Sequence, residues 1–303
     1  MCTDQSSADL PARTATAPLF PLVYVIVLNW QGWRDTISCL DSLRRLSYPI
    51  YRLLVVDNGS TDGSVARIRA AHPEVPVVET GKNLGFAGGC NAGIRVALGE
   101  GAEYVWLLNN DALADPRSLS ALVAAAASDP RVGAAGSVIS QLSRTEPEIW
   151  GGGWVRLWIG KTRHARGPSD PLTYLSGGSL LIRAEALRRC GLLDEIFFMY
   201  WEDTDLSFRL VAAGWTLAVV PSSRIWHQEN SSTRKLPYLR VQYYHQARVR
   251  FLWKHARWPL AAILLGLLDM SARDLVRRRW RSLLSAWRGA ASGFWGGPPR
   301  PSR

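Results

Sequence analysis

The sequence is poor in cysteine, and its four cysteines form no paired motif. They stand far apart, at positions 2, 39, 90 and 190. Closely paired cysteines make the disulfide frameworks of secreted domains and the ligand sets of zinc sites. Their absence argues against both kinds of site and fits a protein of the reducing cytosol.

Long apolar runs are also lacking. The longest, residues 258–268, has 11 residues, whereas a membrane-spanning helix needs about 20. The first 20 residues are polar and rich in Ala, Pro and Thr, without the apolar segment of a signal peptide. We therefore expect neither a signal peptide nor a spanning helix, and a disordered lead-in over residues 1–20.

Acidic residues are scarce in the C-terminal part of the chain. Residues 233–303 hold 15 Lys/Arg against two Asp, whereas residues 1–232 hold 21 Lys/Arg against 23 Asp/Glu. All of the excess positive charge in the net charge of +11 thus lies in this tail. Such asymmetry indicates an anionic partner for the tail, either a membrane surface or a nucleic acid.

An amphipathic helix is predicted within this tail. Among its arginines, one helix face is aromatic and aliphatic, with Trp280, Leu283, Leu284 and Trp287. This pattern is typical of helices that lie in a membrane interface. We expect docking on an anionic membrane surface, and packing of the stripe on the protein or a second subunit is the alternative. Nucleic acid is not expected, because no recognition motif accompanies the charge.

The sequence does contain buried strands that alternate with helices. Apolar runs at residues 24–28, 52–56, 75–78 and 104–108 are typical of strands buried on both faces, and segments of helical periodicity separate them. This alternation predicts βαβ units, a parallel sheet and an α/β fold. Further on, Asp115 and Pro116 indicate the start of a helix that runs to Ser128.

Residues 141–170 lose this regular pattern and predict a long loop. The segment is rich in glycine and basic residues and contains three tryptophans, Trp150, Trp154 and Trp158. Tryptophan stacks on sugars and bases but also fills cores, so both interpretations stay open.

Polar side chains follow the predicted strands, namely Asn29, Asp57, Asn83 and Asp111. The carboxyl ends of parallel strands meet at one edge of an open α/β sheet, and ligands bind there. We therefore predict that the four residues converge on one crevice, with Asp111 as an anchor for a metal ion and a diphosphate. Ordinary turn residues are the alternative, because Asn and Asp are common in turns.

A second group of candidate residues begins at a predicted helix over residues 202–213. Asp203 lies at its N-terminus on the same face as Leu206, and Asp205 and Arg209 have the spacing of an ion pair. Asp203 is a candidate general base. Burial would raise its pKa, whereas the helix dipole would lower it. An acid without chemistry at a helix N-terminus is the alternative.

Two features flank this helix. Gly177 and Gly178 permit close approach of the backbone to a ligand. His227 follows a late strand; a lone histidine is more often structural, but neutral imidazole is a common metal ligand.

Together these motifs resemble family 2 of the inverting glycosyltransferases, which have the GT-A fold, and in particular its rhamnosyltransferase-like and galactofuranosyltransferase-like bacterial branch. The resemblance covers residues 22 to about 250, with the motifs in the family's order. They are VIVLN (25–29), VVDNGSTDGS (55–64), NLGFAGGCNAG (83–93), LLNND (107–111) and WEDTDL (201–206).

The resemblance implies a role for each matching residue. Asp203 is implied as the catalytic base, with Glu202 beside it. The implied ligands of a divalent cation, Mg²⁺ or Mn²⁺, are Asp111, Asn109 and His227. Asn109 stands where the family's Asp-x-Asp motif has its first acid, and because it is neutral it reduces the negative charge that faces the cation. The donor site is implied to contain Leu28, Asn29, Asp57, Asn83, Gly85, Phe86, Asn110 and Asp111, and the acceptor side Gly177, Gly178 and Trp201.

The resemblance also implies the reaction and its setting. A sugar, either L-rhamnose, another deoxyhexose or galactofuranose, would pass from a dTDP- or UDP-sugar to a saccharide or lipid-linked acceptor of the cell envelope. We expect a GT-A domain over residues 21–232, with a donor half (21–115) and an acceptor half (116–232), followed by a basic helical region (233–303). The expected location is the cytoplasm, at the inner face of the plasma membrane, and homo-oligomerisation stays open.

Two other functions compete with this interpretation. A catalytically silent nucleotide- or sugar-binding scaffold at the membrane needs the same fold. A nucleotide-dependent oxidoreductase is disfavoured, because Asn29-Trp-Gln-Gly stands where a Gly-x-Gly-x-x-Gly motif is needed.

Overall fold

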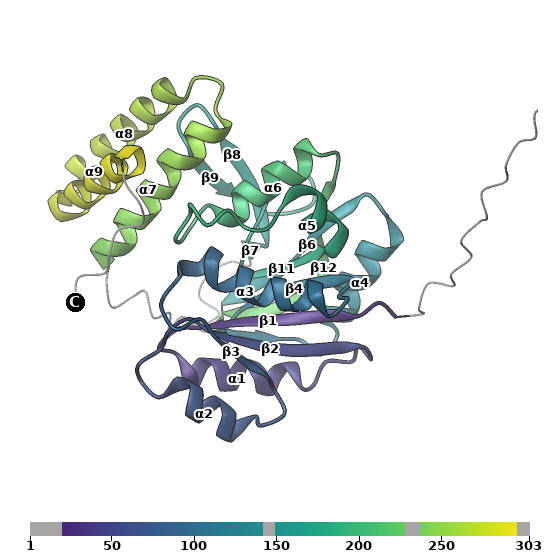
Figure 1. Ribbon diagram of the computed structural model, residues 1–303. Helices are drawn as coiled ribbons and strands as arrows, with labels where there is room; N and C mark the ends of the chain where they lie inside the picture. The colour runs from purple at the N-terminus through teal and green to yellow at the C-terminus, as the bar shows by residue number, and fades with distance from the viewer. Residues whose placement is uncertain (1–19, 142–148, 228–236, 296–303) are drawn as a thin grey trace, which may run out of the picture.

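The computed structural model describes residues 20–141, 149–227 and 237–295 (Figure 1). The predicted lead-in lies outside the described residues except for Phe20. Within them, one large sheet has the strand order β3-β2-β1-β4-β11-β6-β12-β5, with β7 beside β6, and a small sheet has the order β10-β8-β9. The C-terminal helices lie together on one side of the molecule (Figure 1).

The first half of the large sheet is parallel, as predicted. Its strands are β1 (Val23–Asn29), β2 (Tyr51–Asp57), β3 (Val77–Glu79) and β4 (Tyr104–Asn109). The helices between them are α1 (Trp33–Leu43), α2 (Ser64–Ala71) and α3 (Gly85–Gly99). Side chains of β1 alternate between two cores, because Val25 packs with α1 and α2 while Ile26 packs with α3. Burial on both faces explains the unbroken apolar runs.

Helix α3 approaches the sheet closely because glycine faces it. A Cβ atom on Gly93 would lie 2.7 Å from Ile26 and 2.9 Å from Val56. This contact places the N-terminus of α3, with Gly85 and Phe86, beside the carboxyl ends of β1 and β2.

The second half of the large sheet is mixed, so the prediction of a parallel sheet holds for β1 to β4 and for the pair β6 and β12 but not for the whole sheet. Its elements are β5 (Ala112–Ala114), α4 (Ser118–Ser128), β6 (Val132–Gln141), β11 (Ser179–Arg183), α5 (Ala184–Cys190), α6 (Glu202–Ala212) and β12 (Thr216–His227). Strand β11 is antiparallel to both β4 and β6. It therefore enters the sheet at the carboxyl end of β4, where Ser179 pairs with Leu108.

One local prediction is wrong. The chain continues from Asp111 into strand β5, and the following helix begins at Ser118 rather than at Asp115. Asp115 instead stabilises the preceding turn, because its carboxylate accepts a hydrogen bond from the amide of Arg117.

The predicted long loop also contains strands. They are β7 (Ile149–Trp150), β8 (Gly152–Arg156) and β9 (Lys161–His164), and β8 also pairs with β10 (Tyr174–Leu175). Residues 142–148 of that segment lie outside the described part of the chain. Glycine and arginine have low β-propensity, which hid the pairing from the sequence pattern. Of the three tryptophans, Trp158 is exposed and the other two are half-buried.

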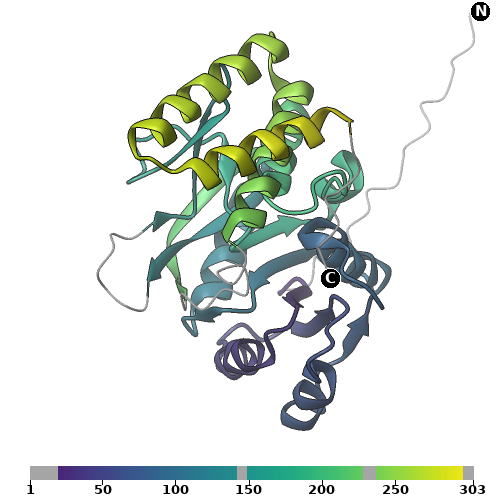
Figure 2. The same cartoon turned by 90° about the vertical axis from the view of Figure 1, so that its left-hand side faces the viewer.

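The C-terminal helices form a unit of their own (Figure 2). They are α7 (Pro237–His255), α8 (Pro259–Val276) and α9 (Trp280–Trp295), and they share a core that includes Phe251, Ile263 and Ala290. Phe197 and Trp201, from the segment that leads into α6, join this core. None of the helices in the described ranges is long and apolar enough to cross a membrane.

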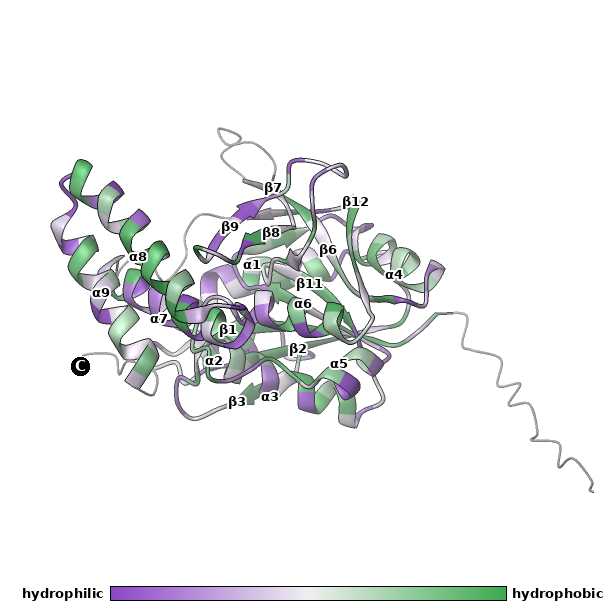
Figure 3. Ribbon diagram, turned by 90° about the horizontal axis from the view of Figure 1, so that it is seen from above, coloured by the Kyte–Doolittle hydropathy of each residue, from purple (hydrophilic) through white to green (hydrophobic). Residues whose placement is uncertain are grey.

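Small residues of α9 face α7, so the predicted aromatic stripe remains largely outside. A Cβ atom on Gly293 would lie 2.8 Å from Val249, and Ala286 and Ala290 are buried. In contrast, Trp280 and Leu284 are each 59% exposed. Helix α8 exposes further apolar residues. Figure 3 shows its hydrophobic stretches in green.

Candidate active site

A cavity of about 310 Å³ lies at the carboxyl ends of the parallel strands. Both halves of the sheet contribute to it. Its lining residues are Leu28, Trp30, Asp35, Asn58, Asn83, Gly85, Phe86, Asn109, Asn110, Asp111, Ser176, Gly177, Gly178, Met199, Tyr200, Glu202, Asp203 and His227. The structure thus brings together all of the predicted site residues except Asn29, Asp57 and Trp201.

Asn29 and Asp57 lie beneath the cavity and bind each other. Asn29 Nδ2 donates a 2.7 Å hydrogen bond to Asp57 Oδ1, and the amide of Ser60 donates one of 2.9 Å to Asp57 Oδ2. Both side chains are buried. In this structure they hold the ends of β1 and β2 together and shape the turn that follows.

Trp201 is buried in the core shared with the C-terminal helices. Its ring lies 4.7 Å from that of Phe251 and 5.8 Å from that of Tyr244, measured between centroids. It therefore joins the start of α6 to α7 and does not line the cavity.

Six lining residues were not predicted from the sequence, namely Trp30, Asp35, Asn58, Ser176, Met199 and Tyr200. Asn58 had a signal, because it follows Asp57 directly in the Asp-Asn-Gly-Ser motif. Its Nδ2 donates to Asn83 Oδ1 and to the carbonyl of Gly85, and its Oδ1 accepts from the amide of Leu84. Asn58 thereby fixes the loop in which Asn83 and Gly85 line the cavity.

Asp111, His227 and Asn109 meet at one corner of the cavity. His227 Nε2 lies 3.3 Å from Asp111 Oδ1 and 3.2 Å from Asn109 Nδ2. Pairing of β12 with β5, where His227 lies opposite Ala112, brings the imidazole to this corner. Burial raises the pKa of the Asp111 carboxyl, and His227 opposes that shift.

This corner fits a divalent cation only with help from a ligand. One carboxylate, one imidazole and one amide are suitable donors, but they leave most of the positions of a six-coordinate ion to other oxygens. The described residues contain no group of three His, Cys, Asp or Glu side chains that could hold a metal ion. A bound diphosphate is the kind of group that supplies the missing oxygens.

Asp203 lies at the N-terminus of α6 and accepts hydrogen bonds on both carboxylate oxygens. The amide of Gly177 donates to Oδ2 at 2.8 Å, and the amide of Thr204 donates to Oδ1 at 2.6 Å. Burial nevertheless outweighs these bonds and raises the pKa of Asp203. The sequence left this balance open; in the structure desolvation prevails, which suits a proton acceptor.

The residues just before α6 adopt an uncommon backbone. Tyr200 and Trp201 have φ angles of 71° and 70°, in the left-handed region that non-glycine residues rarely adopt. Such backbone strain is often found at functional sites. Here it turns the chain so that Tyr200 and Asp203 line the cavity while Trp201 is buried.

Glu202 is a buried acid beside Asp203. It is 6% exposed, and its Oε2 has no hydrogen-bond partner among the residues that the structure describes. Burial, followed by the charge of Asp203, raises its pKa well above the ordinary value. The protonated form of Glu202 is therefore favoured, in which it is a donor rather than a base.

Gly177 and Gly178 line the cavity between Asp203 and the corner that contains Asn109. A Cβ atom on Gly177 would lie 3.4 Å from Asp203 Oδ2, and one on Gly178 would lie 3.7 Å from Asn109 Nδ2. Only two residues of backbone thus separate the carboxylate of Asp203 from the corner with Asn109 and His227.

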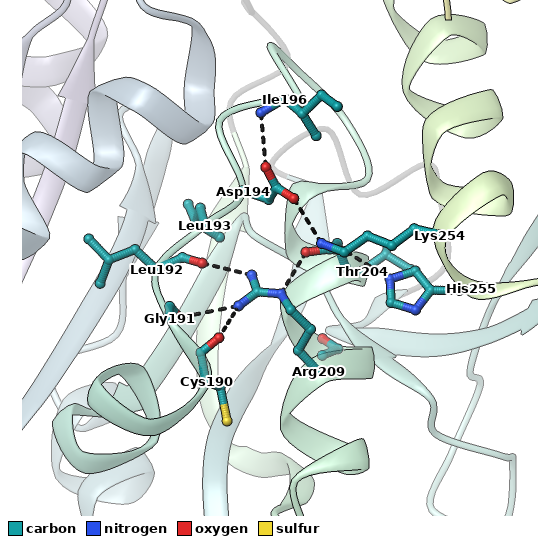
Figure 4. Close-up of polar contacts among 12 residues, drawn as sticks. Cys190, Gly191, Leu192, Leu193, Asp194, Ile196, Thr204, Arg209, Lys254 and His255 are labelled. Atoms are coloured by element: carbon teal, nitrogen blue, oxygen red, sulfur yellow. Dashed lines mark hydrogen bonds and ion pairs between the residues drawn. The ribbon is translucent and has the colours of Figure 1, made fainter. Parts of the chain in front are cut away.

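An ion-pair network holds α6 in place. Asp205 is fully buried and pairs with Arg209 at 2.7 Å, as the sequence spacing predicted, and also with Lys254 and His255 of α7. Arg209 in turn donates to the carbonyls of Cys190, Gly191 and Leu192 (Figure 4). Burial alone would raise the pKa of Asp205, but hydrogen bonds from His255, Lys254 and Arg209 lower it to about 2.

Comparison with known proteins identifies the family. The model of the family described as "Glycosyl transferase family 2" matches residues 24–191. The chain belongs to glycosyl transferase family 2. This assignment confirms the resemblance seen in the motifs.

Relatives of this family 2 glycosyltransferase include an L-rhamnosyltransferase and a galactofuranosyltransferase. An N-acetylglucosaminyl-diphospho-decaprenol L-rhamnosyltransferase of Mycobacterium tuberculosis is 35% identical over 260 residues, which are 76% of this chain and 84% of the relative. The galactofuranosyltransferase GlfT1 of the same organism is 35% identical over 107 residues, 34% of this chain and 35% of that protein.

Solved structures confirm the GT-A fold of this glycosyltransferase. The mannosyltransferase PcManGT of Pyrobaculum calidifontis, in complex with GDP-Man and Mn²⁺, superposes with a TM-score of 0.61 at 18% identity, covering 92% of this chain and 88% of the other. GalNAc-T7 with UDP, GalNAc and Mn²⁺ has a TM-score of 0.60 at 18% identity and covers 77% and 48%.

Proposed function

We propose that this glycosyltransferase transfers L-rhamnose, with inversion, from a nucleotide-diphosphate sugar to a hydroxyl of a lipid-linked saccharide. The observation that carries the proposal is that Asp203 and Asp111 line one cavity, where Gly177 lies beside Asp203 and Gly178 beside Asn109. The choice of L-rhamnose rests on the 35% identical L-rhamnosyltransferase, whose name also gives a lipid diphosphate in the acceptor.

The donor is proposed to bind between the parallel strands and the N-terminus of α3. Leu28, Asn83, Gly85 and Phe86 line this side of the cavity, with Asn110 beside Asp111. Asn29 and Asp57 support it from below through their mutual hydrogen bond. This division agrees with a donor half over residues 21–115.

A divalent cation, Mg²⁺ or Mn²⁺, is proposed to bind at the corner formed by Asp111, His227 and Asn109. When bound, it would neutralise the negative charge on the leaving diphosphate. The cation in two structural neighbours supports this proposal. Without it, Asp111 is a buried carboxylate whose charge His227 and a backbone hydrogen bond offset only in part, since its pKa stays raised.

Asp203 is proposed to act as the base toward the acceptor in the half formed by residues 116–232. Its carboxylate removes the proton of the acceptor hydroxyl, whose oxygen forms a bond to the anomeric carbon as the bond to the diphosphate breaks. One displacement of this kind inverts the anomeric centre and forms no covalent glycosyl-enzyme. Glu202, whose pKa burial raises, lines the same cavity beside Asp203.

The C-terminal helices are proposed to dock on the inner face of the plasma membrane. Leu260, Leu264 and Leu268 follow one another at intervals of four on α8 and are 54 to 62% exposed. With Trp280 and Leu284 of α9 they give an apolar surface on a strongly basic region, which is the combination that anionic membranes bind.

Assay of the purified protein with a panel of dTDP- and UDP-sugars tests the proposal. The acceptor is a GlcNAc joined through diphosphate to a short prenyl chain, and Mn²⁺ is present. We expect transfer from dTDP-L-rhamnose and a product whose new linkage has the anomeric configuration opposite to that of the donor. Binding of nucleotide without transfer of any sugar would instead favour the catalytically silent scaffold.

A further inference from the structure

A second cavity, of about 520 Å³, lies between the small sheet and the C-terminal helices. We refer to it as the basic pocket. Its ionisable lining comprises six cationic side chains and two acidic ones, beside His245; they are Lys161, Arg240, Arg248, Arg273, Arg277 and Arg279 against Asp269 and Asp274. These residues come from β9, α7, α8 and the segment that leads into α9, and the excess positive charge favours an anion.

Arg248 is the central feature of the basic pocket. It is 4% exposed, yet its Nε and Nη2 atoms have no hydrogen-bond partner among the described residues. Its Nη1 lies 3.4 Å from Nδ1 of His245. A buried guanidinium with two unused donors is costly, because nothing replaces its hydration. An anion in the cavity would remove that cost.

The backbone is shaped to hold Arg248 in this position. Any side chain at Gly266 would overlap Nη2 of Arg248, and a Cβ atom on Gly160 would lie 3.2 Å from its Cγ. Two glycines, from α8 and from the segment before β9, thus leave room for the guanidinium.

The acidic residues of the basic pocket have other partners. Asp269 pairs with Arg273 at 2.6 Å, and Asp274 accepts a 3.0 Å hydrogen bond from the hydroxyl of Ser282. His245 provides no negative charge, since burial and then Arg248 and Arg273 lower its pKa to about 3 and keep it neutral. Among the described residues neither acid forms an ion pair with Arg248, although the charge of Asp269 acts on it from a distance.

Tyr200 lines both the active site and the basic pocket, so the two cavities adjoin at this residue. Asp203 and Arg248 belong to the linings of these two adjoining cavities. On the other side, α8 carries Asp269 and Arg273 toward the pocket and exposes Leu264 and Leu268. Active site, basic pocket and apolar surface thus follow one another.

We propose that the basic pocket binds the diphosphate group that joins the acceptor sugar to its lipid, with Arg248 as the principal ligand. This proposal rests on the proposed function. Guanidinium donates two parallel hydrogen bonds to phosphate oxygens, which matches the two free donors of Arg248. The acceptor sugar would then point past Tyr200 to Asp203, and the lipid would leave along α8.

Binding of farnesyl diphosphate, measured by calorimetry, tests the pocket without any need for transfer. We expect Arg248→Met to weaken this binding by about tenfold or more, since it removes charge-assisted hydrogen bonds. Arg288→Met removes the same charge from an exposed position of α9 outside the pocket and should have no effect. Binding of dTDP should be equal in all three proteins.

A second variant tests the same pocket in case Arg248→Met does not fold. Lys161→Met changes the pocket wall on β9, and we expect it to weaken farnesyl diphosphate binding even if Arg248→Met does not fold. Inorganic diphosphate should compete with farnesyl diphosphate, whereas competition by dTDP would place the ligand in the donor site and overturn the proposal. Unchanged farnesyl diphosphate affinity in both pocket variants would also overturn it.

Failure of the pocket and failure of the proposed function are distinguishable. If farnesyl diphosphate binds through Arg248 but no sugar is transferred, the pocket stands and the function fails. If the wild-type protein transfers sugar and Arg248→Met keeps the same KM for the diphosphate-linked acceptor, the function stands and the pocket assignment is wrong.

Discussion

The amide of Gly177 donates a 2.8 Å hydrogen bond to Oδ2 of Asp203, which ties the proposed base to the wall of the cavity. Each carboxylate oxygen has two lone pairs. Oδ2 therefore keeps one for the acceptor hydroxyl, while Oδ1 receives the amide and hydroxyl of Thr204. The bond thus orients Asp203 and leaves it able to accept a proton.

Replacement Asp203→Asn should remove the base and preserve the site's shape. An amide accepts the hydrogen bonds on one side but cannot take a proton from the acceptor. We expect kcat to fall by about 10² to 10⁴, the usual contribution of a general base. Calorimetric titration with dTDP should give the wild-type affinity, since the base does not contact the nucleotide in the proposed complex. A variant with full activity would exclude Asp203 as the base.

The pH dependence of kcat should show the raised pKa of Asp203. An ordinary aspartate has a pKa of about 3.9, and burial places that of Asp203 higher. The base is active when deprotonated, so kcat should fall as the pH is lowered through the raised pKa, with a midpoint above about 4. The folded fraction must be followed in parallel by circular dichroism. A kcat that stays flat down to the ordinary value would contradict the role of burial.

Replacement Asn109→Asp should strengthen cation binding. It adds a second carboxylate beside Asp111 at the corner where Asn109 lies 3.2 Å from His227. In the presence of dTDP we expect the Kd for Mn²⁺ to fall by about tenfold, because hard cations bind more tightly to sites with more charged oxygen ligands. Electron paramagnetic resonance of free Mn²⁺ measures this change. Asp111→Asn should shift the Kd in the opposite direction, and equal affinities in all three proteins would place the cation elsewhere.

The continuous apolar runs were sufficient to predict β1, β2 and β4, because a strand covered on both faces has no exposed side to interrupt the pattern. The rule that polar strand ends converge predicted the place of Asn83 and Asp111. It did not predict that Asn29 and Asp57 would bind each other beneath the cavity, since strand order alone does not tell which side chains point into a crevice.

The basic pocket was beyond sequence reasoning for a different reason. Lys161, Tyr200 and Arg248 come from three segments with no shared motif, and only tertiary packing brings them together. The same holds for the bonds from Lys254 and His255 of α7 to Asp205, whereas its pairing with Arg209 follows from helix geometry and was predicted.

Replacement Asp205→Asn should destabilise the protein, because it leaves Arg209 without its carboxylate partner at a buried site, although Lys254 keeps its pairing with Asp194. Removal of one member of a buried ion pair costs about 3 kcal/mol or more in the free energy of unfolding. Asp269→Asn, which breaks an exposed pair with Arg273, should cost less than about 1 kcal/mol. Urea denaturation at neutral pH measures both.

The contribution of Asp205 to the free energy of unfolding should also depend on pH. Its pKa of about 2 in the folded protein lies below the value of about 3.9 for an unfolded aspartate. Its stabilising contribution is therefore present above about pH 4 and is lost as the pH falls toward 2. The difference in stability between wild type and Asp205→Asn should shrink over that interval; a constant difference would mean that the charge is not responsible.

The apolar surface of α8 should determine membrane association. The double change Leu264→Gln and Leu268→Gln replaces two half-exposed leucines, each of which would contribute about 1 kcal/mol when its exposed part is buried in a bilayer. We expect at least about tenfold weaker association with vesicles of phosphatidylglycerol and phosphatidylcholine in a sedimentation assay.

Ile50→Gln removes an exposed apolar side chain next to β2, outside the helical unit, and serves as the matched control. Salt should weaken binding of both proteins, because the arginines of the tail act through charge, whereas only the double variant loses the apolar part. If the double variant binds vesicles as the control does, α8 is not the docking surface, and the exposed stripe of α9 becomes the next segment to change.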